Sequence, residues 1–437
     1  MLKKIYNPGS LMLPVLNVLV RAISLAGRFG LSLYLAKYLT LADLGMFGLI
    51  TGVTNMMPSL AGWGLSYFVN REIIDKSKLV SGRLIRDRLA VTFVSLAVLL
   101  AVAAPFVIGF HVLPNATLAL LALAIIILEC VLFDLHGALV SLGHPLAANT
   151  LLFVRSALWV FPAAIIGILY PEHRTLAFVF SWWLGGLLTS FVAMIWVLRG
   201  WPMGRIMTMP VDMKWMLKTI RRGWLVYLSD LGIIGTMFLD RYVVDHFLGL
   251  SSTGVFTLYW SVANSMYLLV DTGIIQILYP KLVAVFNRGD LASGRKLVRG
   301  MRIKAVCMGV GLAAVTGLCF PPVLTLMGKA DIAAQAPVFW VILAGVCVRI
   351  LGDSIDIELT CRRLDKPWAL INMGGIALAF VFSVVSIRAM GLVGAGVSVI
   401  VTHSCLIAMR LWVLKTAKPT QGGGDLLRPS FDAAEEI

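Results

Sequence analysis

Charged side chains are scarce in this sequence, and so are the residues from which metal sites and disulfide frameworks are built. Asp, Glu, Lys and Arg make up 14% of its 437 residues, whereas soluble globular chains have about 25%. Six cysteines and six histidines are present, and no two cysteines form a C-x-x-C pair. The sequence therefore predicts neither a zinc site nor a disulfide framework.

Signatures of catalysis are missing as well. The sequence has no Walker A motif, no G-x-S-x-G motif and no D-x-D pair in a polar loop. Its longest polar segments are roughly 20–25 residues, which is too short for a soluble catalytic domain. We therefore expect function to reside in the apolar part of the chain, and we expect neither an enzyme nor a cofactor or metal ion.

Apolar residues are abundant instead. They make up 59% of the chain, and the mean hydropathy is +0.91. A membrane-spanning helix needs about 20 mostly apolar residues. About twelve such runs are found, at 13–37, 42–69, 89–112, 115–141, 146–169, 175–198, 223–248, 252–280, 304–327, 334–358, 367–389 and 391–414. Because only helices satisfy their backbone hydrogen bonds within one such segment, we predict an all-α polytopic membrane protein.

Lysine and arginine are unevenly distributed among the segments that connect these runs. About 28 of the 37 fall on one side of the predicted membrane, and about four fall on the other. Because basic loops stay in the cytoplasm, we expect both termini there. The net charge of +15 then reflects topology and contact with membrane lipids, not nucleic-acid binding. Residues 416–437 are expected to form a disordered cytoplasmic tail.

The sequence also repeats itself. At a constant offset of 209, residues 38–73 and 247–282 agree at ten positions without a gap. The small and polar residues among them are Gly45/Gly254, Asn55/Asn264 and Gly64/Gly273. Chance agreement on these residues is harder to reach in an apolar chain than agreement on Leu or Val. The repeat predicts two halves of six helices each.

We divide the chain into a six-helix bundle at 1–200, a cytoplasmic linker at 201–222 and a second bundle at 223–415. An even number of spans makes the two halves parallel repeats. Secondary transporters that are built in this way place the substrate site where the repeats meet.

The first predicted helix carries a polar stripe. Asn17, Arg21, Ser24, Arg28 and Ser32 share one face at 3.6 residues per turn. The two arginines lie about 10 Å apart along the helix axis. Because a charge facing lipid costs several kcal/mol, this face should contact protein or a wet cavity. Pairing with buried acids, which would only join helices, is the alternative reading.

The seventh helix has a second stripe, which includes Tyr227, Asp230 and Arg241. At the offset of 209, Arg21 corresponds to Asp230, and these two residues are a hypothetical gate pair. We assign Asn17, Arg21, Ser24, Arg28, Asn55, Tyr227, Asp230, Arg241 and Asn264 to a substrate-binding cavity.

Other charges inside the predicted spans have partners along the chain. Glu129 and Arg155 lie at similar depth in one helical hairpin, which predicts a structural ion pair. Arg349 and Asp353 form an i, i+4 pair. Three acids, Asp134, Asp356 and Glu358, have no evident local partner. Together with Asp353, they are the residues considered for coupling to H⁺ or Na⁺.

Cationic stripes favour an anionic substrate. Guanidinium groups bind phosphate oxygens in a bidentate manner and remain charged at low dielectric. The substrate is therefore expected to carry phosphate or carboxylate groups.

Two segments carry a family resemblance. YLAKYLTLADLGMFGLI at 34–50 resembles the opening of bacterial polysaccharide flippases, the Wzx-type branch of the multidrug/oligosaccharidyl-lipid/polysaccharide (MOP) exporter superfamily. LDRYVVDHFLGLSSTGVFTLYWSV at 239–262 is similar to the seventh and eighth helices of that family, including Asp240 and Arg241.

The resemblance implies a V-shaped pair of six-helix bundles in the bacterial inner membrane. It implies alternating access and translocation of undecaprenyl-pyrophosphate-linked oligosaccharide to the periplasmic leaflet, for polysaccharides such as O-antigen or exopolysaccharide. A polysaccharide polymerase and glycosyltransferases would be partners. Arg21 and Arg28 answer the need for a cationic cavity at the pyrophosphate.

Three other functions stay open. A cation-coupled multidrug exporter of the same superfamily would use carboxylates at its substrate site. A membrane-embedded transferase or polymerase would need a large loop or a loop cluster of carboxylates, and neither is found. The third is a non-transporting component of a glycan assembly complex.

Overall fold

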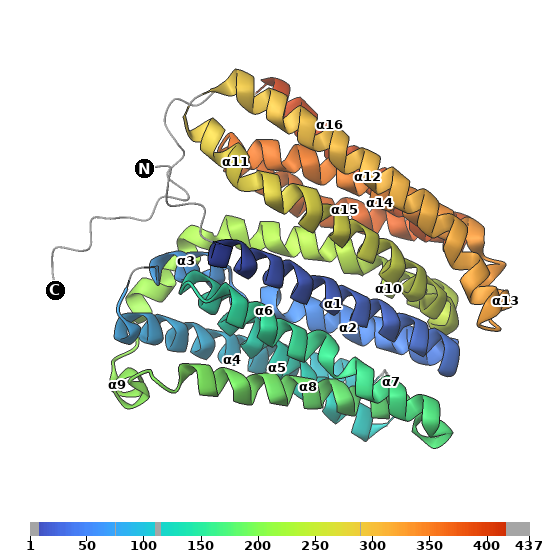
Figure 1. Cartoon of the computed structure of the whole chain (residues 1–437), viewed down its shortest axis with the longest axis horizontal. Coiled ribbons are helices and arrows are strands. Elements are labelled where there is room, and N and C mark those ends of the chain that lie inside the picture. Colours follow the sequence, from blue (N-terminus) through green and yellow to red (C-terminus); the bar gives the residue numbers. More distant parts are fainter. Residues whose placement is uncertain (1–7, 75, 110–114, 289, 417–437) are drawn as a thin grey trace. The chain divides into compact units, whose positions relative to one another are not determined.

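The computed structural model describes residues 8–74, 76–109, 115–288 and 290–416, and these residues are almost entirely helical (Figure 1). No β-strand occurs in these ranges. The predicted all-α class is confirmed. The tail predicted at 416–437 lies, except for its first residue, outside the described part of the chain.

The chain divides into two compact units. The N-terminal unit comprises Met1–Leu39 and Ile50–Trp224, and the C-terminal unit comprises Thr40–Leu49 and Leu225–Ile437. Residues 201–222, which the sequence analysis assigned to a linker, contain a short helix and the start of a long one, and they fall within the N-terminal unit.

The N-terminal unit consists mainly of long apolar helices, two of which begin at a residue whose side chain caps the helix. Asn115 accepts a hydrogen bond from the backbone of Leu118 at 2.8 Å, and Thr175 accepts one from Phe178 at 3.2 Å. Both satisfy free N–H groups in the first turn of a helix. The elements are α1 (Pro8–Tyr38), α2 (Leu41–Gly62), whose first part up to Leu49 belongs to the C-terminal unit, α3 (Leu65–Glu72), α4 (Lys78–Gly109), α5 (Ala116–Ser141), α6 (Pro145–Phe153), the π-helical turn η1 (Val154–Leu158), α7 (Val160–Leu169), the 3₁₀ turn η2 (Pro171–His173), α8 (Leu176–Leu198) and α9 (Met203–Thr208).

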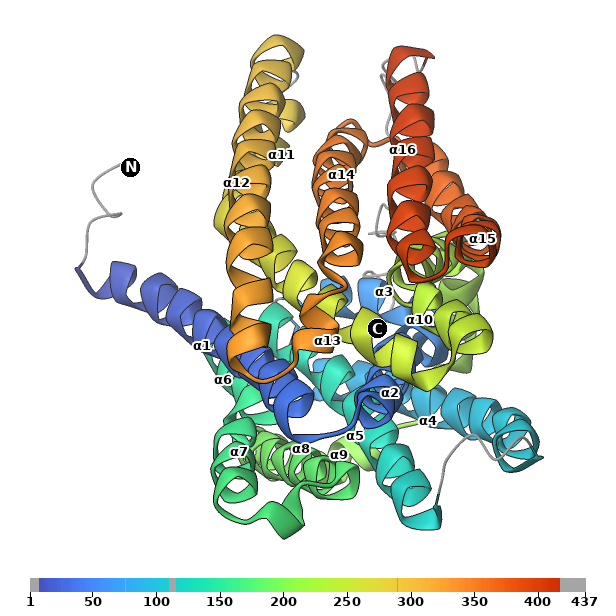
Figure 2. The same ribbon diagram turned by 90° about the vertical axis from the view of Figure 1, so that its right-hand side faces the viewer.

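The C-terminal unit contains the remaining elements. They are α10 (Met213–Val270), which begins in the N-terminal unit, the π-helical turn η3 (Asp271–Ile275), α11 (Gln276–Asn287), α12 (Leu291–Leu326), α13 (Ala330–Ala333), α14 (Ala336–Cys361), α15 (Asp365–Met390) and α16 (Leu392–Thr416). Helix α14 packs against both α12 and α16, and α15 packs on α16 (Figure 2). Asp290 caps α12, and hydrogen bonds from Ser293 lower the pKa of its carboxyl group.

Ten of the twelve predicted spans overlap helical stretches of the described residues that are long and apolar enough to cross a membrane, whereas the predicted spans 13–37 and 89–112 fall on α1 and α4, which are not among these stretches. Nine helical stretches of the described residues are long and apolar enough to cross a membrane. One of them, Met213–Phe286, contains two predicted spans, and α10 breaks between them at Gly249, whose φ is 79°. The predicted run 42–69 is also interrupted, because Trp63 and Gly64 both have positive φ and separate α2 from α3.

Two repeat-equivalent segments cross each other inside the C-terminal unit. A Cβ atom on Gly45 would lie 2.2 Å from the carbonyl oxygen of Leu250. One on Gly254 would lie 2.0 Å from the carbonyl oxygen of Leu41. Gly45 and Gly254 are equivalent in the repeat, and so are Leu41 and Leu250, so the crossing has local two-fold symmetry. Only glycine allows the two backbones to approach this closely.

Candidate functional site

The polar stripe of α1 is only partly available for a ligand. Ser24 and Ser32 donate to backbone carbonyls one turn earlier, at Val20 (2.8 Å) and Arg28 (3.2 Å). The side chains of Asn17 and Arg21 lie outside the described residues, and so does the hypothetical gate between Arg21 and Asp230. Among the predicted stripe residues, Arg28 is the charged one that the structure describes, and its side chain is exposed.

Arg28 lies beside an ion pair of the same unit. Arg155 on η1 approaches Glu129 on α5 at 3.1 Å, and Trp183 donates to Glu129 at 3.3 Å. Arg28 is close enough to Glu129 and Arg155 for coulombic interaction. Two guanidinium groups and one carboxylate give this cluster a net charge of about +1. Within the described part of the chain, Arg28 forms no ion pair.

Local helix geometry brings these groups together. Gly27 lets α1 approach η1, because a Cβ there would lie 2.9 Å from the Cβ of Ala157. The π-helical turn η1 carries Arg155 toward Glu129. Single π-helical turns are frequent at functional sites. The cluster of Arg28, Glu129 and Arg155 is the candidate anion site of the N-terminal unit.

The predicted cavity residues of other helices have differing environments. Asn55 is exposed and donates to the carbonyl of Thr51 at 2.7 Å. Its repeat equivalent, Asn264, accepts from Arg349 at 3.5 Å. Tyr227 and Asp230 are half-buried.

Arg241 is buried instead of lying on an open stripe. Its guanidinium donates to the carbonyl of Gly48 at 3.1 Å and stacks on Phe238 at 5.0 Å. The neighbouring Asp240 accepts hydrogen bonds from Ser383 and Ser398 on α15 and α16. These contacts hold the helices of the C-terminal unit together.

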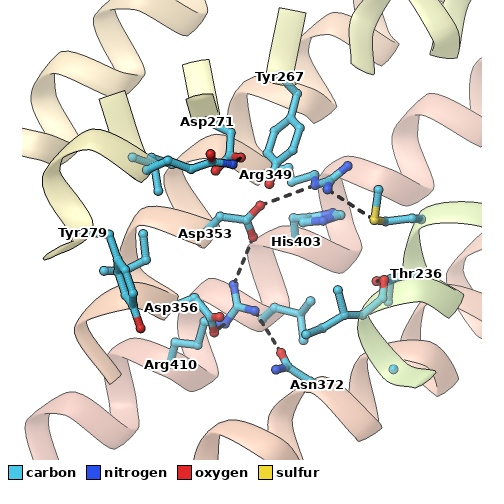
Figure 3. Close-up of a pocket in the computed structure, with 17 residues that line it drawn as sticks. Thr236, Tyr267, Asp271, Tyr279, Arg349, Asp353, Asp356, Asn372, His403 and Arg410 are labelled. Carbon is cyan, nitrogen blue, oxygen red and sulfur yellow. Dashed lines mark hydrogen bonds and ion pairs between the residues drawn. The ribbon is translucent and has the colours of Figure 1, made fainter. Parts of the chain in front are cut away.

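A polar cavity of about 380 Å³ opens within the C-terminal unit (Figure 3). It lies among α10, η3, α11, α14, α15 and α16. The charged residues that line it are Asp271, Arg349, Asp353, Asp356 and Arg410, together with the imidazole of His403. We call it the polar cavity.

Two arginines organise the polar cavity. Arg410 approaches Asp356 at 2.9 Å and Asp353 at 3.9 Å, and it donates to Asn372 at 3.0 Å. Arg349 approaches Asp353 at 3.5 Å, so that Asp353 lies between the two guanidinium groups (Figure 3). Arg349 also stacks on Tyr267, at 3.9 Å from the ring centre.

The polar cavity is lined by more acids than arginines. Three carboxylates and two guanidinium groups line it, so the formal charge summed over these side chains is about −1 when His403 is neutral. One proton or one monovalent cation would restore neutrality. Ionisable groups that face the interior of a membrane protein commonly mark ion pathways and proton relays. Asp271 lies on the π-helical turn η3, as Arg155 lies on η1 in the other unit.

Acids without a local partner in the sequence have partners on other helices. Asp134 pairs with Arg88 on α4 and accepts from Thr92 at 2.7 Å. Glu358 pairs with Arg302 on α12 at 3.1 Å, and it also pairs with Arg362 four residues later, so the expectation that Glu358 has no local partner is wrong. Asp356 pairs with Arg410 and accepts from Trp368 at 2.8 Å.

The distribution of basic residues predicts that Arg88, Arg302 and Arg410 lie at the cytoplasmic side as topology signals. Arg88 and Arg410 are buried instead, and all three arginines pair with acids. Each lies near the end of a span, where its sequence context is that of a loop charge. The signal in the sequence that could have indicated their pairing is that each arginine lies within about one helical turn of the end of a predicted span.

Breaking the polar cavity should destabilise the protein. Arg410→Gln leaves Asp356 without its ion partner, and losing one member of a buried pair costs about 3–5 kcal/mol. We expect a lower midpoint of thermal unfolding in detergent. Arg410→Gln combined with Asp356→Asn should recover most of the loss. Lys415→Gln, an exposed charge on the same helix, is the control, and an equal effect of both single changes would contradict the prediction.

Solved structures show what this arrangement of helices is similar to. No protein-family model matches the chain, and no curated protein is similar to it in sequence. An inward-facing multidrug resistance MATE family transporter of the MOP superfamily has 16% identity and a TM-score of 0.66, over 92% of this chain and 100% of its own. The lipid II flippase MurJ, in an inward closed conformation, has 12% identity and a TM-score of 0.69, over 92% and 88%.

A third similar structure is a mutant of the Vibrio cholerae MATE transporter VcmN, with 13% identity and a TM-score of 0.58, over 95% of this chain and 99% of its own. At this level of identity the likeness concerns the fold. Together with the long apolar helices, it identifies this chain as a multi-pass membrane protein with the fold that these MATE transporters and the MurJ flippase share.

Proposed function

We propose that the chain is a flippase for lipid-linked oligosaccharides. Its substrate is a glycan on undecaprenyl pyrophosphate, which it moves by alternating access to the periplasmic leaflet of the bacterial inner membrane, for cell-surface polysaccharides such as O-antigen. The observation that carries the proposal is Arg28, an exposed cation on a helix of a membrane protein that forms no ion pair within the described part of the chain.

The charge at Arg28 selects the class of substrate. A lone charge is costly in lipid and is retained where it meets a polar ligand or water. Its neighbours Arg155 and Glu129 neutralise each other, so the cluster presents a net cation. A pyrophosphate supplies several oxygens for bidentate contact with guanidinium groups. Arg21, seven residues earlier on the same face, is proposed as the second contact.

The similar structures support a transport function. The charge of the candidate site is the basis for proposing the class of substrate. MurJ is named as a lipid II flippase, which moves a lipid-linked substrate, and the MATE proteins are named as multidrug transporters. The same fold therefore serves two classes of cargo. The cationic cluster at Arg28 favours the lipid-linked anion over a cationic drug.

We propose that the polar cavity couples transport to H⁺ or Na⁺. One such cation can neutralise the negative formal charge of its lining, and Asp353 is the candidate ligand because it is a predicted coupling residue that lines the cavity. Gain or loss of a cation there would alter the ion pairs that join α14 and α16. Asp134 and Glu358 are each held by an arginine on a neighbouring helix, and we propose that they serve the fold.

Both termini are proposed to lie in the cytoplasm, because the basic segments gather on their side of the predicted membrane. The polysaccharide polymerase and glycosyltransferases that share the substrate are the proposed partners.

The test is transbilayer movement in proteoliposomes. The purified protein is reconstituted with a fluorescent undecaprenyl-pyrophosphate-linked oligosaccharide, and lipid accessible from outside is measured over time. Facilitated movement compared with protein-free vesicles is expected. Absence of movement for several such lipids, with correctly inserted protein, would refute the proposal.

A cation-coupled multidrug exporter is the second candidate, and the net negative polar cavity is the observation that favours it. The same vesicles are loaded with organic cations under a proton or sodium gradient. Gradient-driven efflux of organic cations without flipping of the lipid would establish the exporter.

Coupling is tested with Asp353→Asn, which removes the excess negative charge of the polar cavity. Lipid movement in the wild type is expected to accelerate under an inward or outward gradient of H⁺ or Na⁺. We expect the variant to lose this response, because a neutral cavity has little affinity for a cation. Asp331→Asn, an exposed acid of the same unit, should keep the response. A full gradient response in Asp353→Asn would contradict the assignment.

A further inference from the structure

A second cavity lies within the N-terminal unit and is almost wholly apolar. Its volume is about 470 Å³, in the range of about 300–1,000 Å³ in which small-molecule sites fall. Residues of α4, α5 and α8 line its walls, and residues of 201–207 line one end. Helix α5 packs against both α4 and α8 (Figure 1). Apolar cavities stay dry and accept apolar guests. We call it the apolar pocket.

The apolar pocket opens toward the surroundings of the unit. Phe93 and Ile195 on its wall are 48% and 54% exposed, and Met203 and Met207 on α9 are 48% and 71% exposed. In a membrane protein, exposed apolar side chains of a spanning segment, such as Phe93 and Ile195, meet lipid, so a lipid chain can enter from the side.

Arg86 is the charged residue of the lining, and its charge is used to hold α9 in place. Its guanidinium donates to the carbonyl of Met209 at 2.7 Å and to that of Ile206, and it pairs with Asp87. The carbonyls at the end of α9 are thereby satisfied. Because the Arg86 guanidinium is engaged in this way, the interior of the pocket remains apolar.

The size of the apolar pocket matches one leaflet. Its lining on α4 runs from Gly82 to Phe93, about 16 Å along the helix axis. Half of a bilayer core is about 15 Å thick. The pocket begins near the basic end of the unit, where α8 ends at Leu198. One acyl chain of a phospholipid fits this depth.

Basic side chains surround the covered end. Arg199 follows the last wall residue of α8, Arg205 lies between the pocket residues Met203 and Ile206, and the ammonium group of Lys78 lies near Gly200. All three basic side chains are exposed. The nearby acid Asp212 is engaged by Arg83 at 3.6 Å. The rim is therefore positive and complements an anionic headgroup.

We infer that the apolar pocket binds one acyl chain of an anionic phospholipid, whose phosphate contacts Arg199 and Arg205. The basic rim selects anionic over zwitterionic lipids, and the leaflet-length interior selects an acyl chain over the much longer polyprenyl chain of the proposed substrate. This inference does not depend on the transport activity.

Photo-crosslinking tests the inference with the full-length protein in phosphatidylcholine vesicles. Phosphatidylglycerol with a diazirine in one acyl chain is the probe, and labelled peptides are identified by mass spectrometry. We expect labels concentrated on residues 82–93 and 191–207. Ala90→Phe fills the pocket from an exposed wall position and should reduce this labelling by roughly tenfold. Ala97→Phe, exposed on the same helix outside the pocket, should not.

The headgroup contact has its own pair of variants. Arg199→Gln with Arg205→Gln should reduce labelling roughly tenfold, since each cation near the surface contributes to anionic lipid binding. Lys214→Gln with Lys218→Gln, two exposed lysines of the same unit, should leave it unchanged. Unchanged labelling of the exposed residues of α15 verifies insertion.

Three results would overturn the inference. One is even labelling along all exposed apolar helices, and another is labelling that both Ala90→Phe and the double arginine change leave intact. The third is displacement of the probe by excess undecaprenyl phosphate, which would assign the pocket to the substrate chain.

Discussion

Replacing Arg28 by glutamine is expected to slow the movement of undecaprenyl-pyrophosphate-linked oligosaccharide by roughly 10- to 100-fold, because a hydrogen bond to a charged group contributes about 1.5–3 kcal/mol. The change removes the cation that the Glu129–Arg155 pair does not neutralise. Arg28→Lys keeps the charge and loses the bidentate geometry, so an intermediate rate is expected. The measurement is the initial rate of lipid exposure in proteoliposomes.

Two features of this experiment separate a substrate contact from a general defect. Arg295→Gln removes an exposed arginine at the start of α12 and should flip lipid at the wild-type rate. The thermal midpoint of Arg28→Gln should stay near that of the wild type, since the exposed side chain has no ion partner among the described residues. Wild-type flipping by Arg28→Gln would remove the observation on which the proposed function rests.

Placing a side chain at the Gly45–Gly254 crossing should damage the fold severely. A Cβ on Gly254 would lie 2.0 Å from the Leu41 carbonyl oxygen, and the obstacle is backbone, which cannot rotate away. Overpacking in a dense interior commonly costs about 1–3 kcal/mol, and a backbone clash is expected to reach or exceed the upper end. Gly254→Ala should lower the thermal midpoint in detergent, and Gly254→Leu should abolish recovery of folded protein.

The reciprocal contacts sharpen this prediction. Because a Cβ on Gly45 meets the Leu250 carbonyl at 2.2 Å, Gly45→Ala should cost about as much as Gly254→Ala. Gly300→Ala on α12 is the matched control, since its Cβ would meet nothing within 4 Å. Alanine favours a helix over glycine by about 0.5–1 kcal/mol, so the control should be slightly stabilised. Equal midpoints for Gly254→Ala and the control would contradict the crossing.

The architecture could be predicted from local patterns. Each long apolar run with few charges predicts a helix by itself, because a helix in lipid satisfies its backbone hydrogen bonds internally. The repeat at an offset of 209 also singles out Gly45 and Gly254, which the structure places in contact with each other's segments. Even the i, i+4 pair of Arg349 and Asp353 follows from helical periodicity.

The Glu129–Arg155 pair of one hairpin could be predicted, but the pairing of charges between helices farther apart along the chain could not be predicted in this way. Arg88 with Asp134, Arg302 with Glu358 and Arg410 with Asp356 join residues of different helices, 46–56 positions apart along the chain. Periodicity gives the face of a helix and leaves open which helix lies opposite. An arginine near the end of a span has the same local sequence whether it faces the cytoplasm or turns inward to a carboxylate.

Local breaks in the helices could not be predicted from the sequence pattern either. The interruption at Trp63 and Gly64 and the π-helical turns η1 and η3 depend on how each helix packs against its neighbours, and apolar periodicity does not record them. The helical class, the approximate positions of the apolar helices and the polar stripe of α1 follow from local sequence, because backbone hydrogen bonding and hydropathy are local. The polar cavity, the apolar pocket and the partners of the buried charges arise from packing between distant segments.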